Sequence, residues 1–229
     1  MKSIVFDTGP LISFSLNSII ELFEKLKQHY KGEFYISPSV KKEAVDNPLK
    51  SKKYKFEAIQ LLELIKKNII NIHSYETLSQ DTQELLGLAN SIYKARGNYI
   101  KVFHRGEIEA LALVLKLDSD AFVLDEFVTR SIIENPKKVK KRLSRKLHTN
   151  IIVNEKNLKK FTDRIKKVKV IRSVELITIA YELGLLDRYK LVEKNPEKNL
   201  LEAVLWGAKL NGCSISQKEI SKIMKLEGF

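Results

Sequence analysis

The sequence is poor in features that would mark a cross-linked, nucleotide-binding or membrane protein. Cys213 is the only cysteine, which excludes an intrachain disulfide and a zinc site built from several cysteines. There is no glycine-rich phosphate loop, internal repeat or low-complexity tail. Residues 8–20 form the longest uncharged stretch near the N-terminus, and they are too few and too polar to cross a bilayer, which takes about 20 apolar residues. Because no secretion signal precedes the first apolar run, we expect a cytoplasmic protein without membrane attachment.

Acidic residues are scarce in one part of the chain, whose overall net charge is +13. Residues 1–130 contain 18 lysines and arginines against 17 acids, whereas residues 131–229 contain 23 against 11. Between residues 137 and 172 there are 15 basic residues and only two acids. Heat-adapted proteins also carry many surface lysines, but they enrich glutamate together with lysine. The imbalance therefore favours a surface that binds a polyanion such as nucleic acid.

What the chain does contain is a regular alternation of short apolar runs and helical periodicity. Its 229 residues, 44% of them hydrophobic, suffice for one large domain with a sizeable core. The apolar runs predict strands over residues 3–7, 33–36, 69–73, 121–125 and 168–171. The periodicity predicts helices over residues 10–30, 37–47, 54–67, 78–95, 106–115, 127–134, 173–186, 197–210 and 216–225, and two more between 136 and 167. Alternating strands and helices predict an α/β fold with a mainly parallel sheet.

Four acids lie at segments that such a fold could bring together. Asp7 and Asp125 end apolar strands, and the carboxyl ends of parallel strands border the ligand crevice. Glu107 opens a helix and can face the same edge, whereas Glu43 lies within a short helix. Each also has an ordinary interpretation, because Asp7 and Asp125 could cap helices, Glu107 could stabilise a first turn and Glu43 could be a surface acid. Gathered together, they would suit Mg²⁺ or Mn²⁺.

The segments that carry these acids resemble the PIN-domain ribonucleases, particularly the prokaryotic toxin-like branch. The similar stretches are Ile4-Val-Phe-Asp7-Thr8-Gly-Pro, Ile36-Ser-Pro-Ser-Val-Lys-Lys-Glu43, Gly106-Glu107-Ile-Glu-Ala-Leu and Phe122-Val-Leu-Asp125-Glu126. They span residues 1–135, and the similarity resumes over residues 168–186. The resemblance implies a three-layer α/β/α fold and hydrolysis of RNA by a two-metal endoribonuclease. It also implies that Asp7, Glu43, Glu107 and Asp125 are metal ligands, with Glu126 a second candidate beside Asp125 and Thr8 in a supporting role.

The remainder of the chain is interpreted relative to that family pattern. We expect a core over residues 1–135, a basic helical insertion over residues 136–167, and a closing strand and C-terminal helices of the same domain over residues 168–229. The insertion would bind RNA through Lys137, Lys138, Lys140, Lys141, Arg142, Arg145 and Lys146. Arg105 and Arg130 could contact phosphate or form surface ion pairs. Phe161 is the only aromatic residue of the insertion, which therefore predicts little base stacking.

Two other hypotheses belong to different classes of protein. The chain could bind nucleic acid without cutting it, with the acids in structural roles and the last two helices forming a helix-turn-helix-like pair around Asn211-Gly212. It could also be a toxin-like module held by an antitoxin-like partner protein. The resemblance further makes a homodimer plausible.

Overall fold

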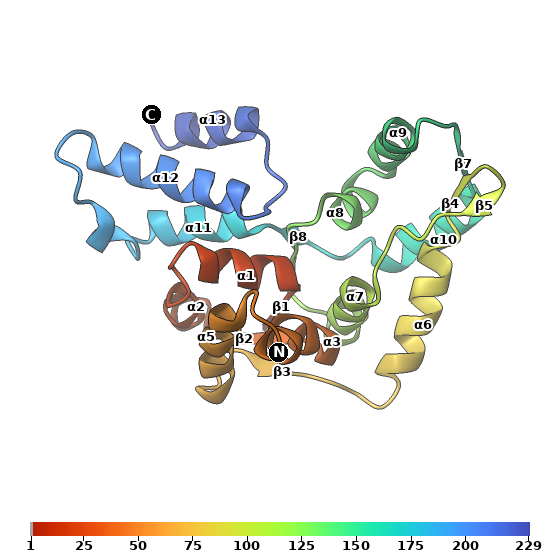
Figure 1. Cartoon of the computed structure of the whole chain (residues 1–229), viewed down its shortest axis with the longest axis horizontal. Coiled ribbons are helices and arrows are strands. Elements are labelled where there is room, and N and C mark those ends of the chain that lie inside the picture. Colours follow the sequence, from red (N-terminus) through yellow and green to blue (C-terminus); the bar gives the residue numbers. More distant parts are fainter. Residues whose placement is uncertain (1) are drawn as a thin grey trace.

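The computed structural model describes residues 2–229, except for the side chains of Ile133, Glu134, Pro136 and Lys137. At its centre is a five-stranded parallel sheet in the order β3-β2-β1-β6-β8 (Figure 1). The strands are β1 (Ser3–Phe6), β2 (Glu33–Ile36), β3 (Asn71–Ile72), β6 (Ala121–Val123) and β8 (Val170–Ile171). Helices flank this sheet, so the predicted three-layer α/β/α fold is confirmed.

Strand β1 lies in the middle of the sheet because it is apolar on both faces. All four of its residues are buried, as parallel strands covered on both sides require. The chain builds outward from β1 through β2 to β3, then crosses back and adds β6 and β8 on the other side. Phe6 is paired with Val123 in the β1–β6 register. The strand order therefore reverses between β1 and β6, which is where open α/β sheets form their ligand crevice.

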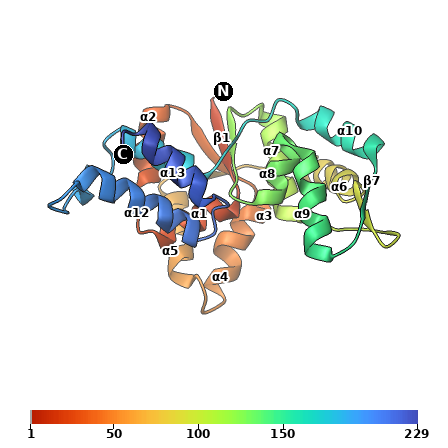
Figure 2. The ribbon, with the colours of Figure 1, turned by 90° about the horizontal axis from the view of Figure 1, so that it is seen from above.

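The helices that follow β1 and β2 are shorter and more broken than the sequence predicts. They are α1 (Thr8–Leu16), α2 (Leu22–Tyr30), α3 (Pro38–Lys41), the π-helix η1 (Lys42–Asp46), α4 (Asn47–Leu49) and α5 (Lys55–Lys66). The prediction of one helix over residues 10–30 is wrong, because Ser18 adopts a left-handed conformation with φ of 56° between α1 and α2. Figure 2 shows α1 and α2 on one side of β1 and α7 (Arg105–Leu117) on the other.

A strand of a second sheet replaces the end of another predicted helix. Helix α6 (Leu78–Ala89) ends before residue 90, and the expected continuation to residue 95 is instead strand β4 (Tyr93–Ala95). Strand β4 pairs antiparallel with β5 (Asn98–Tyr99) and with β7 (Ile151–Val153). Arg96 and Gly97 form the two-residue turn between β4 and β5, both with positive φ, as tight hairpin turns require. Gly97 thus shapes a hairpin and does not end a helix.

The basic segment and the C-terminal segment complete the molecule on opposite sides (Figures 1 and 2). Helix α8 (Phe127–Glu134) leads into the first, which contains α9 (Pro136–Leu147) and α10 (Glu155–Ile165) with β7 between them, so the expected helical insertion includes a strand as well. The second contains α11 (Ser173–Glu182), the short 3-10 turn η2 (Asp187–Tyr189), α12 (Pro196–Leu210) and α13 (Gln217–Leu226). Within residues 2–229, no helix combines the length and the apolar character needed to cross a membrane.

Candidate functional site

Asp7 lies directly after β1, at the edge where the strand order reverses. Its backbone N–H donates to the Val123 carbonyl at 3.0 Å, which fixes the start of α1 against β6. Asp7 occupies the N-cap position of α1, but its side chain makes no capping hydrogen bond. The side chain is only 7% exposed. The backbone N–H groups of Thr8 and Gly9 lower the pKa of this carboxylate, but burial outweighs them, so helix capping alone does not explain it.

Glu107 lies in the first turn of α7 and approaches the same edge. Its Oε2 accepts hydrogen bonds from the Thr129 hydroxyl at 2.9 Å and from the His104 backbone N–H at 3.3 Å. Thr129 is fully buried, and its own backbone N–H donates to Glu126 at 2.7 Å. A single buried threonine thus holds Glu107 and Glu126 beside each other. Thr129 lies four positions beyond Asp125 on the next helix, and it was not among the site residues predicted from the sequence.

Asp7 and Glu107 are electrostatically coupled. Burial raises the pKa of Asp7 to about 7, and the charges of Glu107 and then Glu43 add to the rise. Burial likewise raises the pKa of Glu107 to about 7, with further contributions from the charges of Glu126 and Glu43. Desolvation and like charges both penalise an ionised carboxylate. These acids therefore repel one another in the protein alone, which is the condition that a bound cation would relieve.

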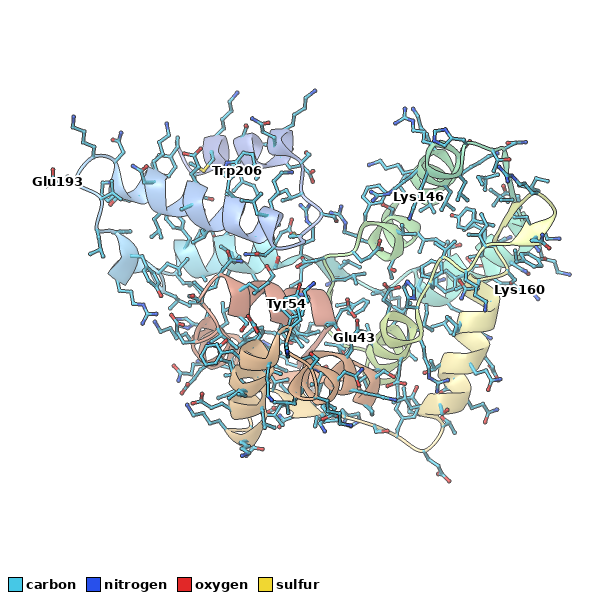
Figure 3. The ribbon with its side chains drawn as sticks, viewed as in Figure 1. Glu43, Tyr54, Lys146, Lys160, Glu193 and Trp206 are labelled. Atoms are coloured by element: carbon cyan, nitrogen blue, oxygen red, sulfur yellow. The ribbon has the colours of Figure 1, made fainter. Side chains whose placement is uncertain are left out.

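Glu43 reaches this group from the π-helix η1. Its side chain is exposed, and its Oε2 would lie 3.2 Å from a Cβ built at Gly106. π-Helical turns often occur at functional sites because they redirect side chains locally. Gly106 leaves room for Glu43 next to the first turn of α7. Figure 3 shows Glu43 near the middle of the molecule, between the arms formed by the C-terminal helices and by α9.

Asp125 is buried at the same edge but faces the C-terminal segment. Its Oδ1 accepts the Ser173 backbone N–H at 2.8 Å, and the Cys213 thiol also hydrogen-bonds to this carboxylate. Burial raises the pKa of Asp125 although these hydrogen bonds oppose the rise. A Cβ built at Gly9 would lie 3.4 Å from the Asp125 Cβ and 4.0 Å from the Asp7 Oδ2. Gly9 is thus the immediate neighbour of both acids.

The two candidates for the fourth acidic position therefore have different surroundings. Glu126 caps α8 through the Thr129 N–H and acts electrostatically on Glu107. Asp125 lies beside Asp7 across Gly9 and is only 3% exposed. The carboxylates of both residues belong to the same edge of the sheet. We place Asp125 on the Asp7 side of the site and Glu126 on the Glu107 side.

The expected supporting residues divide in a similar way. The Thr8 hydroxyl is buried beside Asp7 and has no hydrogen-bond partner among the described residues. Arg105 donates to the Ser79 hydroxyl at 3.0 Å, and Arg130 donates to the Ser214 carbonyl at 3.2 Å. Both arginines are therefore held by the protein itself. Glu109 points away from the other acids and accepts hydrogen bonds from the backbone and side chain of Ser39 at 2.7 and 2.6 Å.

The donor set suits a hard divalent cation. The candidate ligands are carboxylates, and the buried Asp125 Oδ2 and Thr8 Oγ1 have no hydrogen-bond partner within the described part of the chain. Across residues 2–229, however, no three His, Cys, Asp or Glu side chains lie close enough together to enclose an ion. The chemistry of the residues fits a metal, and the acids would have to draw together around it.

The expected basic contacts lie on α9, which packs against α8. Lys138, Lys141, Arg142 and Arg145 line an open pocket of about 400 Å³ together with Phe127. Lys140 and Lys146 are exposed on the same helix but do not line this pocket, and the Lys137 side chain lies outside the described residues. Phe161 is fully buried and packs on Phe103 with ring centroids 5.7 Å apart.

Comparison with known proteins identifies the family. A family model described as a PIN domain matches residues 3–137, more than half of the chain, so the protein belongs to the PIN-domain family. PIN domains are generally nucleases that act on nucleic acid, typically with divalent metals. No curated protein and no solved structure matches the chain. Assignment to the toxin-like branch remains a prediction, as do the antitoxin-like partner and the homodimer.

Proposed function

We propose that this protein is a metal-dependent endoribonuclease that hydrolyses RNA phosphodiester bonds. The observation that carries the proposal is the convergence of acids from separate segments on one edge of the sheet. Asp7 follows β1, Asp125 follows β6, and Gly9 adjoins both. Glu107 and Glu43 reach the same edge from α7 and η1 and raise the pKa of Asp7. Glu107 and Glu126 also cap helices, and Glu43 is exposed, but capping does not explain why Asp7 and Glu107 are buried enough for burial and like charge to raise the pKa of each.

In this proposal Asp7, Glu43, Glu107 and Asp125 hold Mg²⁺ or Mn²⁺, with Glu126 as a further ligand on the Glu107 side. The bound ions would activate water as the nucleophile and stabilise charge on the leaving oxygen. The protein contributes orientation, because Thr129 fixes Glu107 and the Ser173 N–H fixes Asp125. The free Thr8 hydroxyl can donate to a phosphate oxygen that enters between the acids.

The substrate would be held by the segment over residues 136–167. Its exposed lysines and arginines would bind the phosphate backbone, which supplies affinity with little information about base sequence. The closing strand and helices over residues 168–229 would complete the same domain, since β8 joins the central sheet. RNA would therefore meet the acids from the α9 side.

The test is cleavage of a labelled RNA with Mn²⁺ or Mg²⁺, with and without a chelator. Asp7→Asn should lower the rate by roughly 100-fold or more, since even outer-shell partners of a metal typically account for 10–100-fold. Asp118→Asn makes the same chemical change at an exposed residue at the C-terminal end of α7 and should leave cleavage unchanged. If the purified protein cuts no RNA with either metal, or if Asp7→Asn cuts as fast as the wild type, the proposal is wrong.

One observation favours a second candidate, a nucleic-acid-binding protein without catalysis. Among the described residues the acids do not form a group that already encloses an ion. In that case RNA would bind to α9, the chelator would not alter binding, and no condition would give cleavage. A binding measurement beside the cleavage assay separates the two candidates.

A further inference from the structure

An aromatic residue adjoins both the acids and the basic helix. Phe127 directly follows Glu126 and begins α8. Its ring is half-buried and lies under the Arg142 guanidinium, whose Cζ is 4.2 Å from the ring centroid. Phe127 also lines the open pocket that Lys138, Lys141, Arg142 and Arg145 surround. An aromatic surface and four positive charges therefore share one hollow, one residue away from an acid of the site.

The basic residues of this pocket form one face of α9. Lys138, Lys141, Arg142 and Arg145 stand at positions i, i+3, i+4 and i+7, which share a side of a helix. Val139 and Leu143 are buried on the neighbouring face and anchor the helix on the core. Lys140 points elsewhere. The pocket is thus backed by a helix whose position is fixed by packing.

Within the part of the chain that the structure describes, no basic side chain of α9 forms an ion pair with an acid. Like charges at i and i+4 of a helix destabilise it slightly, and a bound anion would remove that cost. An aromatic ring among these charges adds a surface that free phosphate does not need. The combination fits a ligand with both a planar apolar part and regularly spaced phosphates.

We propose that this pocket binds an unpaired nucleobase of the RNA strand, packed against Phe127 and Arg142. Lys138, Lys141 and Arg145 then contact the phosphates on either side of that nucleotide. Stacking on aromatic and guanidinium surfaces needs a base that has left its own helix, because a duplex hides the faces of its bases. The inference rests on the proposed function and deepens it: the substrate is single-stranded where it passes α9, next to the acids.

The experiment measures binding without cleavage, by fluorescence anisotropy of labelled RNA in chelator. The full-length protein and its Phe127→Ala, Phe127→Tyr and Lys141→Gln variants are titrated with three probes. The probes are a single-stranded RNA, the same strand in a duplex, and short strands with or without abasic positions. Lys140→Gln, with the same loss of charge on another face of α9, serves as the matched comparison.

Phe127→Ala should weaken binding of the single strand by about tenfold, since stacking of one base contributes on that scale. The duplex and the fully abasic strand should lose little, and Phe127→Tyr should retain most of the affinity because it keeps the ring. Lys141→Gln should reduce the salt dependence of binding by about one phosphate contact, and more than Lys140→Gln does. Thermal unfolding of each variant checks that the Phe127 variants remain folded at the assay temperature.

Equal losses for single strand, duplex and abasic strand would overturn the base-binding pocket, and so would no loss for any probe. Failure of the proposed function looks different, because it appears as the absence of cleavage with metal while the Phe127 effect on binding persists. Intact cleavage together with an unchanged affinity of Phe127→Ala would refute the pocket alone.

Discussion

One arginine lies beside the loop that holds Asp125 and another lies on α9, and the two use their positive charge in opposite ways. On the C-terminal side, Arg172 is 9% exposed and fully engaged. Its guanidinium binds Glu175, donates to Glu219 at 2.9 Å and donates to the Ser214 carbonyl at 3.3 Å. On the α9 side, Arg142 is exposed and lies over the Phe127 ring, without an ion pair among the described side chains.

The difference shows how burial decides the role of a charge. A buried guanidinium must be paired, because leaving it without partners costs several kcal/mol. Arg172 therefore has a structural role. It joins the start of α11 to α13 and to the loop that carries Cys213 and Ser214. That loop and Ser173 hold Asp125. An exposed arginine can stay unpaired in water and remains available to a ligand.

The C-terminal helices, which lie beyond the segment matched by the family model, help to support the acid site. Residues 138–229 lie outside the matched PIN-domain segment. Arg130 of the matched segment donates to the Ser214 carbonyl, and the Ser214 N–H donates to the Asp125 carbonyl at 3.2 Å. The C-terminal segment therefore supports the Asp125 side of the acid site, whereas α9 carries exposed positive charge.

The largest effect is expected from breaking the paired arginine. Arg172→Ala should lower the free energy of unfolding by about 3 kcal/mol, because it leaves two acids and the Ser214 carbonyl without their shared donor. Urea unfolding measures the change. Arg188→Ala removes an arginine whose side chain is 54% exposed and paired with Glu21, and should destabilise the fold far less than Arg172→Ala does. Equal costs for the two variants would contradict the distinction between the buried and exposed ion pairs.

A smaller effect concerns the acid partner of Arg172 and depends on pH. Burial alone would raise the pKa of Glu219, but hydrogen bonds from Ser216 and Arg172 outweigh it and lower the pKa to about 2. A lowered folded pKa stabilises the fold above the unfolded value near 4.5, and this contribution is lost as pH falls from about 4.5 towards 2.

Glu219→Gln should therefore destabilise the protein at pH 6 by on the order of 1 kcal/mol, a figure reduced for the 45% exposure of the side chain. The gap between the variant and the wild type should close as pH approaches 2 to 3, measured by urea unfolding across that range. Glu202→Gln, an exposed change on α12, should show no such closing gap. A gap that stays constant with pH would exclude Glu219 as an ionised partner.

The sequence predicted the parts of this arrangement that depend on local pattern. The apolar run ending in Asp7 located the end of β1 to within one residue, whereas the run ending in Asp125 overran the end of β6 at Val123 by two residues. The parallel order still placed the two acids near each other. The predicted helix over residues 78–95 is correct as far as Ala89 but overruns into β4, because three residues of β4 are too few to establish a strand period. The break at Ser18 depends on one left-handed residue, which the helical periodicity on either side concealed.

The contacts that complete the site could not be predicted because they join distant segments. Ser173 reaches Asp125 from 48 residues away, and Thr129 reaches Glu107 across 22. The role of Phe127 could not be predicted for a similar reason. In the sequence it belongs to an apolar helix, and only the packing of α9 beside α8 places Arg142 over its ring. The aromatic residue of the basic segment itself, Phe161, is buried in the core.

The smallest effect on stability is expected at Arg142, and it completes the contrast. Arg142→Ala should change the free energy of unfolding by less than about 1 kcal/mol, because an exposed cation–π contact contributes only about 0.5–1 kcal/mol. The same variant should weaken RNA binding and reduce its salt dependence, since it removes a free positive charge. Arg172→Ala, in contrast, should lower stability and leave the salt dependence of binding by the folded protein unchanged. If Arg142→Ala destabilises the fold as much as Arg172→Ala and binds RNA with an unchanged salt dependence, Arg142 is a structural residue too, and the two arginines do not differ in role.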